Sequence, residues 1–159
     1  MNACAPFFPE ESVHSGRSNA PLIAATSAAL LTLLPIAAHQ LGLLDHLPDP
    51  PSWIFDSDKI TDSASAHPLG IPDSLLGLGS YGLTLTLVML AQKNERAKKL
   101  LALKLVADGS VAGFNVMKQV VSFRRLCSWC TGTALCTAVM VVAGRRLIGQ
   151  EGSSLRRML

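Results

Sequence analysis

The sequence is short of charge. Asp, Glu, Lys and Arg make up 16% of its 159 residues, whereas a soluble domain of this size carries roughly 25%. Three windows contain none of them: residues 19–44, 74–92 and 126–144. Each window is near or above the ~18 apolar residues that a helix needs to cross a bilayer. The lack of charge in three such windows of one short chain excludes an ordinary soluble domain and argues against buried core helices.

A fourth segment, 97–123, is long and apolar but carries Lys104, Asp108 and Lys118. Lys104 and Asp108 are four residues apart, so they share one helical face and can pair. Ionisable groups at membrane depth tend to face the interior of a bundle, while a lysine near an end extends to the interface. We therefore predict an all-α membrane protein, a four-transmembrane-helix bundle. The predicted helices lie at about 20–44, 71–92, 97–123 and 126–145.

The segments outside these helices are more polar. We expect flexible tails at 1–18 and 150–159, a transmembrane domain over 19–149, and within it a long outer loop at 45–69. The N-terminal residues do not resemble a cleavable signal peptide. They are polar and mixed, and the apolar run behind them is too long for one.

The connections differ in the sign of their charge, which predicts an orientation, because cytoplasmic loops are enriched in Lys and Arg. The connection at 92–99 carries four cations against Glu95, and the end of the chain is also basic. The 45–69 loop carries five Asp against Lys59. An even number of spans puts both termini on one side. We expect an integral protein of a bacterial inner membrane, with both termini cytoplasmic and the 45–69 loop outside.

Cysteine is scarce, and the few cysteines are unevenly placed. None lies between Cys4 and Cys127, but Cys127 and Cys130 form a Cys-x-x-Cys at the start of the last helix, near the periplasmic face. That compartment is oxidising, so disulfides persist there. A zinc site needs four ligands, usually two such pairs or added histidines. Cys136 points elsewhere on the helix and Cys4 lies on the opposite side. The pattern therefore predicts a redox pair and no metal, with Cys136 as a small core residue.

Thiol–disulfide exchange requires a thiolate. A spacing of three residues along the first helical turn brings the sulfurs of Cys127 and Cys130 onto one face. The positive end of the helix favours the anion there. Arg124 and Arg125 lie just before the pair, on the side where the charge rule does not expect them. We predict that both arginines stabilise the Cys127 thiolate.

Two stretches of the sequence resemble the vitamin K epoxide reductase family, whose members are four-helix membrane proteins that pass electrons from thiols to a quinone. One is "LCSWC" at 126–130, which is similar to the family's redox Cys-x-x-Cys in position and surroundings. The other, at 57–82, resembles the family's passage from outer loop to second helix, with its Cys-Asp-x-Val, Ser, Gly-Ile-Pro and Tyr. The matching residues are Asp58, Ser63, Gly70, Ile71, Pro72, Leu76, Gly77 and Tyr81.

The outer loop departs from the family pattern. Family members hold a second cysteine pair there, which relays electrons to the membrane pair, but here Ser57 stands at the position of the later loop cysteine. A serine cannot exchange disulfides, so the two-pair relay is not expected. We also expect no fused thioredoxin-like domain of the kind that some bacterial members carry. We therefore expect an external thioredoxin-like dithiol protein as the partner.

The resemblance implies a membrane thiol–quinone oxidoreductase, a disulfide-forming enzyme that depends on a quinone of the ubiquinone or menaquinone type. The partner's thiol would attack Cys127, the cysteine nearer the aqueous edge, and Cys130 would reduce the quinone. The resemblance also implies that Asp73 and Tyr81 contact the quinone, with Asp73 donating a hydrogen bond while protonated. Otherwise Tyr81 is an interfacial anchor and Asp73 a helix cap. Membrane lipid is a further expected partner, and nucleic acid is not.

Two other hypotheses remain open at this point. The chain could be a redox-inactive scaffold of the same fold, or a protein that binds a quinone or lipid without turnover. The retained Cys-x-x-Cys favours the enzyme. A reversible disulfide between the two cysteines, regenerated by an oxidised quinone, separates the enzyme from both alternatives.

Overall fold

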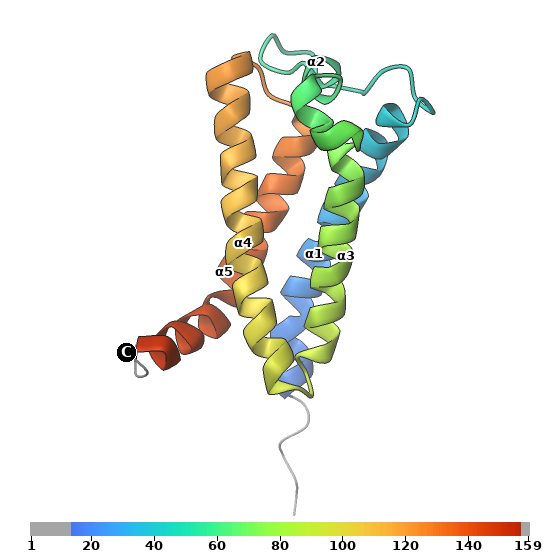
Figure 1. The fold of residues 1–159 in the computed structure, drawn as a ribbon. Coiled ribbons are helices and arrows are strands. Elements are labelled where there is room, and N and C mark those ends of the chain that lie inside the picture. Colours follow the sequence, from blue (N-terminus) through green and yellow to red (C-terminus); the bar gives the residue numbers. More distant parts are fainter. Residues whose placement is uncertain (1–13, 157–159) are drawn as a thin grey trace, which may run out of the picture.

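The computed structural model is a bundle of four long helices, shown in Figure 1. It describes the backbone of residues 14–156 and the side chains of residues 19–149. The four helices are α1 (His14–Gln40), α3 (Asp73–Leu90), α4 (Glu95–Lys118) and α5 (Ser128–Arg156). A π-helical turn, Gln119–Phe123, extends α4. No strand is present between residues 14 and 156, where the only β-type pairing is an isolated bridge.

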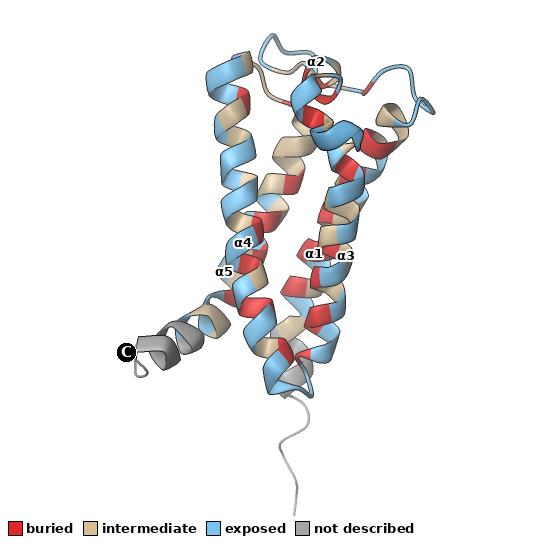
Figure 2. Ribbon diagram, in the orientation of Figure 1, coloured by how far each residue is buried: buried red, intermediate tan, exposed pale blue. Residues whose placement is uncertain are grey.

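Each long helix contains a stretch long and apolar enough to cross a membrane. These stretches are Asn19–Gln40, Asp73–Leu90, Glu95–Phe123 and Ser128–Gly149. Buried residues follow the inward faces of the helices in Figure 2. Large apolar side chains such as Leu31, Leu83, Leu103 and Val139 are more than half exposed on the outside, as suits a surrounding of lipid rather than water. The prediction of a four-helix membrane bundle is confirmed.

Two glycines allow α4 and α5 to approach closely. A Cβ atom on Gly144 would lie 2.3 Å from a methyl carbon of Leu105, and one on Gly109 would lie 2.9 Å from a methyl carbon of Val141. Small residues have this role between membrane helices, where packing rather than hydrophobicity drives association. The close contact lies toward the end of the bundle opposite the cysteines.

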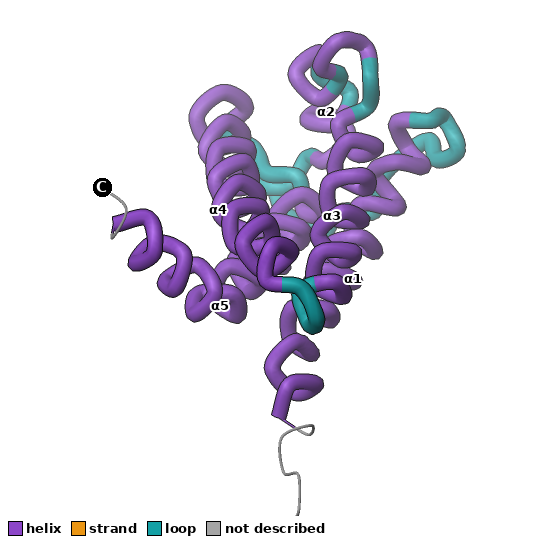
Figure 3. The backbone as a smooth tube through the Cα atoms, turned by 60° about the horizontal axis from the view of Figure 1, so that its bottom comes forward, coloured by secondary structure: helices purple, strands orange, loops and turns teal. Residues whose placement is uncertain are grey.

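Residues 41–72, which we call the cap, close the end of the bundle that carries the cysteine pair (Figure 1). The cap contains the whole predicted outer loop, 45–69. It includes the short helix α2 (Ser57–Thr61) and two 3₁₀ turns, Ala64–Ala66 and Pro68–Gly70. Figure 3 brings the opposite end forward, with the short connection between α3 and α4. In Figures 1 and 3 the last part of α5 turns away from the bundle.

The predicted helix 20–44 is wrong at its end, because α1 stops at Gln40. Gly42 takes a left-handed φ of 73°, and the Leu43 N–H donates back to the Ala38 carbonyl over 2.8 Å. This is the Schellman arrangement that ends many helices at a glycine. The apolar residues after Gln40 therefore belong to the cap.

Other boundaries also differ from the predicted ones. α1 begins at His14, inside the predicted tail 1–18, and α5 runs to Arg156, into the predicted tail 150–159. α3 covers 73–90 rather than 71–92, and α5 starts at 128 rather than 126. α4 starts at 95 rather than 97, because the Asn94 side chain caps it by accepting from the Arg96 N–H over 2.9 Å. Residues 1–13, including Cys4, and 157–159 lie outside the described part.

Candidate redox site

Cys127 and Cys130 form a disulfide at the start of α5, with their Cα atoms 5.2 Å apart. Cys127 immediately precedes the helix. Its carbonyl accepts from the Thr131 N–H over 2.9 Å, and its sulfur accepts from the Cys130 N–H over 3.0 Å. Cys127 thus has the contacts of an N-cap residue. The positive end of the helix and this N–H group both favour negative charge on its sulfur.

The two cysteines have different surroundings. Cys127 is 0% exposed, whereas Cys130 is partly exposed and lines a cavity inside the bundle. Cys127 lies at the end of the bundle, as predicted, but it is completely covered and does not meet water. The disulfide therefore has one closed side and one open side.

The cap is hydrogen-bonded to the residues on both sides of Cys127. Backbone bonds join it to the residue before Cys127, and an indole N–H joins it to the first turn of α5. The contacts are Asp56 N–H to Leu126 O (3.0 Å), Leu126 N–H to Ile54 O (2.8 Å) and Trp129 Nε1–H to Pro48 O (3.1 Å). These bonds hold the cap over Cys127, whose side chain is completely buried.

Asp49 of the cap strengthens this closure. Its carboxylate accepts the Ser57 N–H and the Ser57 hydroxyl, each over 2.6 Å, and also the Ser128 hydroxyl. Ser57 in turn accepts the Ser128 N–H over 3.1 Å. Burial alone would raise the pKa of Asp49, but the hydrogen bonds from Ser128 and Ser57 outweigh it and hold that pKa below its ordinary value. The ionised carboxylate therefore favours the closed cap.

Sequence reasoning missed Asp49 and Ser128, and it treated Ser57 only as an absent cysteine. Asp49 and Ser128 are 79 positions apart in the sequence, so no local sequence pattern predicts their contact. Ser57 is 0% exposed and touches the residue after Cys127. The position thus remains next to the redox pair, although a serine there supplies hydrogen bonds instead of disulfide exchange.

Gln119 in the π-helical turn is another site residue that the sequence did not reveal. Its side-chain oxygen accepts the Cys127 N–H over 3.0 Å, and the residue also lines the cavity. It is buried, at 6% exposed. Gln119 therefore links the backbone of the closed cysteine to the cavity that the other cysteine faces.

The cavity has a volume of about 400 Å³, within the range of small-molecule pockets. Its walls come from α1, α3, α4, α5 and the cap. They are mostly apolar, with side chains such as Leu33, Ile36, Leu76, Val111 and Phe123. Polar side chains come from the cap and several helices: Thr61, Ser65, Asp73, Ser74, Ser80, Tyr81, Asp108, Asn115, Lys118, Gln119 and Thr133. An apolar ring with hydrogen-bonding oxygens, such as a quinone, fits these residues.

Asp73, the first residue of α3, lines the cavity and is itself exposed. Its carboxylate accepts the amide N–H of Gln40 over 2.9 Å. The Gln40 amide oxygen accepts the Ser74 hydroxyl over 2.5 Å, and its N–H also reaches the carbonyl of Thr61 in the cap. Asp73 is therefore held at the cap end of the cavity by the last residue of α1.

Tyr81 also lines the cavity, and it is buried at 8% exposed. Its hydroxyl lies 2.6 Å from the Thr137 hydroxyl. Because Thr137 donates its own proton to the Thr133 carbonyl over 2.8 Å, the Tyr81 hydroxyl is the donor to Thr137. Tyr81 therefore keeps only acceptor capacity toward a ligand. Its burial in the core argues against the interfacial anchor considered above.

The arginines before the pair differ from each other. Arg124 is exposed in a left-handed turn at φ 51°, while Arg125 donates from its guanidinium to the Trp53 carbonyl of the cap. No hydrogen bond joins either of them to a cysteine sulfur among the described side chains. Any effect they have on the Cys127 thiolate acts through space.

A model of the vitamin K epoxide reductase family matches residues 20–144, which is most of the chain. The chain belongs to this family. Membership makes it, in general terms, a membrane thiol–quinone oxidoreductase whose substrates include a quinone and a thiol. No curated protein and no solved structure matches the chain.

Proposed function

We propose that Cys127 and Cys130 carry electrons from an external thioredoxin-like dithiol protein to a quinone of the ubiquinone or menaquinone type, bound in the cavity. The observation that carries this proposal is the position of the disulfide. One of its cysteines lines a cavity of quinone size, and the other lies at the end of the bundle beneath the cap. The electron path therefore runs through a single pair, without the loop pair of the family.

The reaction balances with these groups alone. The partner's two thiols reduce the Cys127–Cys130 disulfide by thiol–disulfide exchange, which leaves a disulfide in the partner and two thiols here. These two thiols then give two electrons and two protons to the quinone. Two S–H bonds break, the S–S bond re-forms, and both quinone carbonyls become hydroxyls. Electron flow from partner to quinone oxidises the partner.

Each site residue has a role in this scheme. Cys127 exchanges with the partner, because it lies at the cap end and its sulfur accepts a helix N–H group. Cys130 reduces the quinone that it faces. Asp73 donates a hydrogen bond to a quinone oxygen at the cap end. Tyr81, whose hydroxyl proton is donated to Thr137, contacts the quinone ring deeper in the cavity. Arg124 and Arg125 stabilise the Cys127 thiolate by their charge at short range.

The test uses the reduced full-length protein in detergent. Adding a short-chain ubiquinone or menaquinone should remove two thiols for each quinone reduced, measured by alkylation and mass. Cys136→Ser should behave like wild type, because Cys136 takes no part in the pair. If quinone binds but both thiols persist, the chain is a binding protein. If it neither binds nor oxidises, the chain is a scaffold, the alternative that the serine at position 57 supports.

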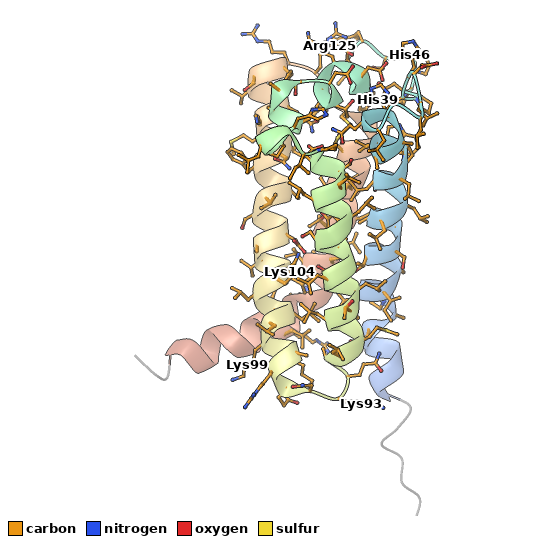
Figure 4. The ribbon with its side chains drawn as sticks, turned by 45° about the vertical axis from the view of Figure 1, so that its right-hand side comes forward. His39, His46, Lys93, Lys99, Lys104 and Arg125 are labelled. Atoms are coloured by element: carbon orange, nitrogen blue, oxygen red, sulfur yellow. A yellow bond between two sulfur atoms is a disulfide. The ribbon has the colours of Figure 1, made fainter. Side chains whose placement is uncertain are left out.

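We also propose that the cap faces the periplasm of a bacterial inner membrane and that both termini are cytoplasmic. Figure 4 has Arg125 and His46 near the cap and Lys93 and Lys99 at the opposite end. The aspartates concentrate in the cap, and four cations lie at 93–99. In a cysteine-free background, Ser52→Cys should react with an impermeant maleimide in intact cells, and Lys93→Cys should react only after lysis. Reaction of both in intact cells contradicts this orientation.

A further inference from the structure

A Lys–Asp ion pair lies near the middle of a membrane span and has no role in the scheme above. Lys104 and Asp108 are one turn apart on α4, within the span Glu95–Phe123, and their charged atoms are 2.5 Å apart. Figure 4 shows Lys104 between the two ends of the bundle. Their side chains are 18% and 9% exposed. Charges at this depth are costly, and where they occur they typically serve a site inside the bundle.

Two hydroxyls of α3 complete the hydrogen bonds of the pair. Lys104 Nζ donates to Ser80 Oγ over 2.7 Å, and Ser80 donates to Asp108 Oδ1 over 3.2 Å. Thr84 donates to Asp108 Oδ2 over 2.9 Å. A carboxylate offers about four acceptor positions. The bonds from Lys104, Ser80 and Thr84 use three, so one position on Oδ2 remains.

The pair is asymmetric with respect to the cavity. Asp108 and Ser80 line the same cavity as Cys130, whereas Lys104 and Thr84 are not among its described lining residues. The ammonium group thus supports the carboxylate from outside the cavity. On α3, Ser80 lies seven residues beyond Asp73, which is about 10 Å along the helix. Asp108 therefore marks the deep end of the cavity and Asp73 the cap end.

We propose that Asp108 accepts the hydroxyl hydrogen of a reduced ring, so that the deep end of the cavity selects a phenolic O–H. An ionised carboxylate has acceptors only, so it binds a hydroxyl and opposes the lone pairs of a carbonyl or an ether. Lys104 donates to the Asp108 carboxylate from outside the cavity. The ligand's identity rests on the proposed function, in which hydroquinone is the product. The selection of a hydroxyl rests on the geometry alone.

The test compares two probes that form no quinone couple, 1-naphthol and 1-methoxynaphthalene, which differ only by a methyl group on oxygen. Binding to the full-length protein in its disulfide form is measured by equilibrium dialysis in detergent, with partition into empty micelles subtracted. A hydrogen bond to a charged group predicts that wild type prefers 1-naphthol by about tenfold or more. Asp108→Asn should reduce that preference to less than about threefold.

A second variant guards against misfolding. Asp108→Asn leaves the Lys104 charge buried and unpaired, so Lys104→Gln with Asp108→Asn removes both charges together. This double variant should keep the disulfide and the elution volume of wild type and lose the preference for 1-naphthol. A wild-type preference near one, or a preference that survives in the folded double variant, overturns the inference. Failure of quinone to oxidise the thiols, with the preference intact, instead refutes the proposed function.

Discussion

The two sides of the Cys127–Cys130 disulfide are built differently. On the cap side, Cys127 is fully buried, and polar contacts with a carboxylate at their centre hold the cap over it. On the bundle side, Cys130 meets an open cavity whose walls are mostly apolar, with polar side chains from several elements. Hydrogen bonds close the cap side of the disulfide, whereas a cavity adjoins its bundle side.

This difference indicates different demands on the two substrates. In the proposed function, the quinone needs only a shaped cavity next to Cys130. A protein thiol must displace the cap before it can attack Cys127, so access on that side depends on the stability of the cap. In the proposed function, opening of the cap therefore controls when the disulfide is reduced. The shape of the cavity determines which quinone Cys130 can reduce.

Among the variants considered, removal of either cysteine should lower quinone-dependent thiol oxidation most. Cys130→Ser and Cys127→Ser should both lower quinone-dependent thiol oxidation to background, because neither can form the disulfide. Only Cys130→Ser should accumulate a mixed disulfide with a partner through Cys127, detected on non-reducing gels. Accumulation only in Cys127→Ser reverses the two roles, and accumulation in neither argues against a protein dithiol as the donor.

Asp73 tests the open side. Asp73→Leu should slow quinone reduction by the ~10²-fold typical of deleting a hydrogen-bond donor to an oxygen that gains charge. Asp73→Asn should retain most of the rate, because an amide can still donate to the quinone and accept from Gln40. The rate is measured with reduced protein and excess quinone, and disulfide formation in air serves as the folding control. If Asp73→Leu reduces quinone at the wild-type rate, Asp73 has no role in quinone reduction and serves only at the start of α3.

Asp49 tests the closed side. Asp49→Ala removes the acceptor of three hydrogen bonds, and the loss of even one bond to a charged group shifts the equilibrium toward the open cap by about tenfold or more. A phosphine should therefore reduce the disulfide at least tenfold faster in this variant. The exposed Asp45 of the same cap provides the matched control, and Asp45→Ala should leave the rate unchanged.

The hydrogen bonds of Asp49 also predict that the rate of phosphine reduction depends on pH. The pKa of Asp49 is lowered in the closed cap, so its contribution to closure is complete above the ordinary carboxyl pKa, about 3.9. That contribution is lost as the pH falls through the lowered value. Relative to Asp49→Asn, wild type should be reduced more slowly and at a constant ratio from pH 7 to 5, and the two rates should converge below about pH 4. A ratio that changes between pH 7 and 5 assigns the closure to another group.

The sequence predicted the open side better than the closed one. Three of the spans follow from uncharged windows and the fourth from a long apolar segment. A Cys-x-x-Cys at the start of the last window places both sulfurs at a helix start. These features depend on local composition and on the period of the helix, both of which a single sequence contains.

The closed side depends on contacts between distant segments. The bonds of Asp49 to Ser128 and of Trp129 to Pro48 join residues about 80 positions apart, and no periodicity encodes them. The early end of α1 was readable, because Gly42 is a typical helix-ending residue. The apolar residues around it, however, made the helix look longer. The role of Gln119 depends on a π-helical turn, which the apolar pattern does not distinguish from α-helix.

Substitution of Arg124 or Arg125 should change the reactivity of the cysteine pair least. Comparing the two variants distinguishes the effect of positive charge on Cys127 from the effect of cap closure. Both carry one positive charge, but only Arg125 bonds to the cap, through the Trp53 carbonyl. In a Cys130→Ser background, Arg124→Ala and Arg125→Ala should each slow alkylation of Cys127 about twofold to fivefold at low salt, if charge alone acts, and the effect should shrink as salt screens it. In the disulfide form, Arg125→Ala should in addition speed phosphine reduction by a few fold, because one bond of the cap is lost. Arg124→Ala should leave that rate unchanged. Equal rates for the two variants in both assays limit the arginines to their charge, whereas faster alkylation in Arg125→Ala shows that closure of the cap outweighs stabilisation of the thiolate.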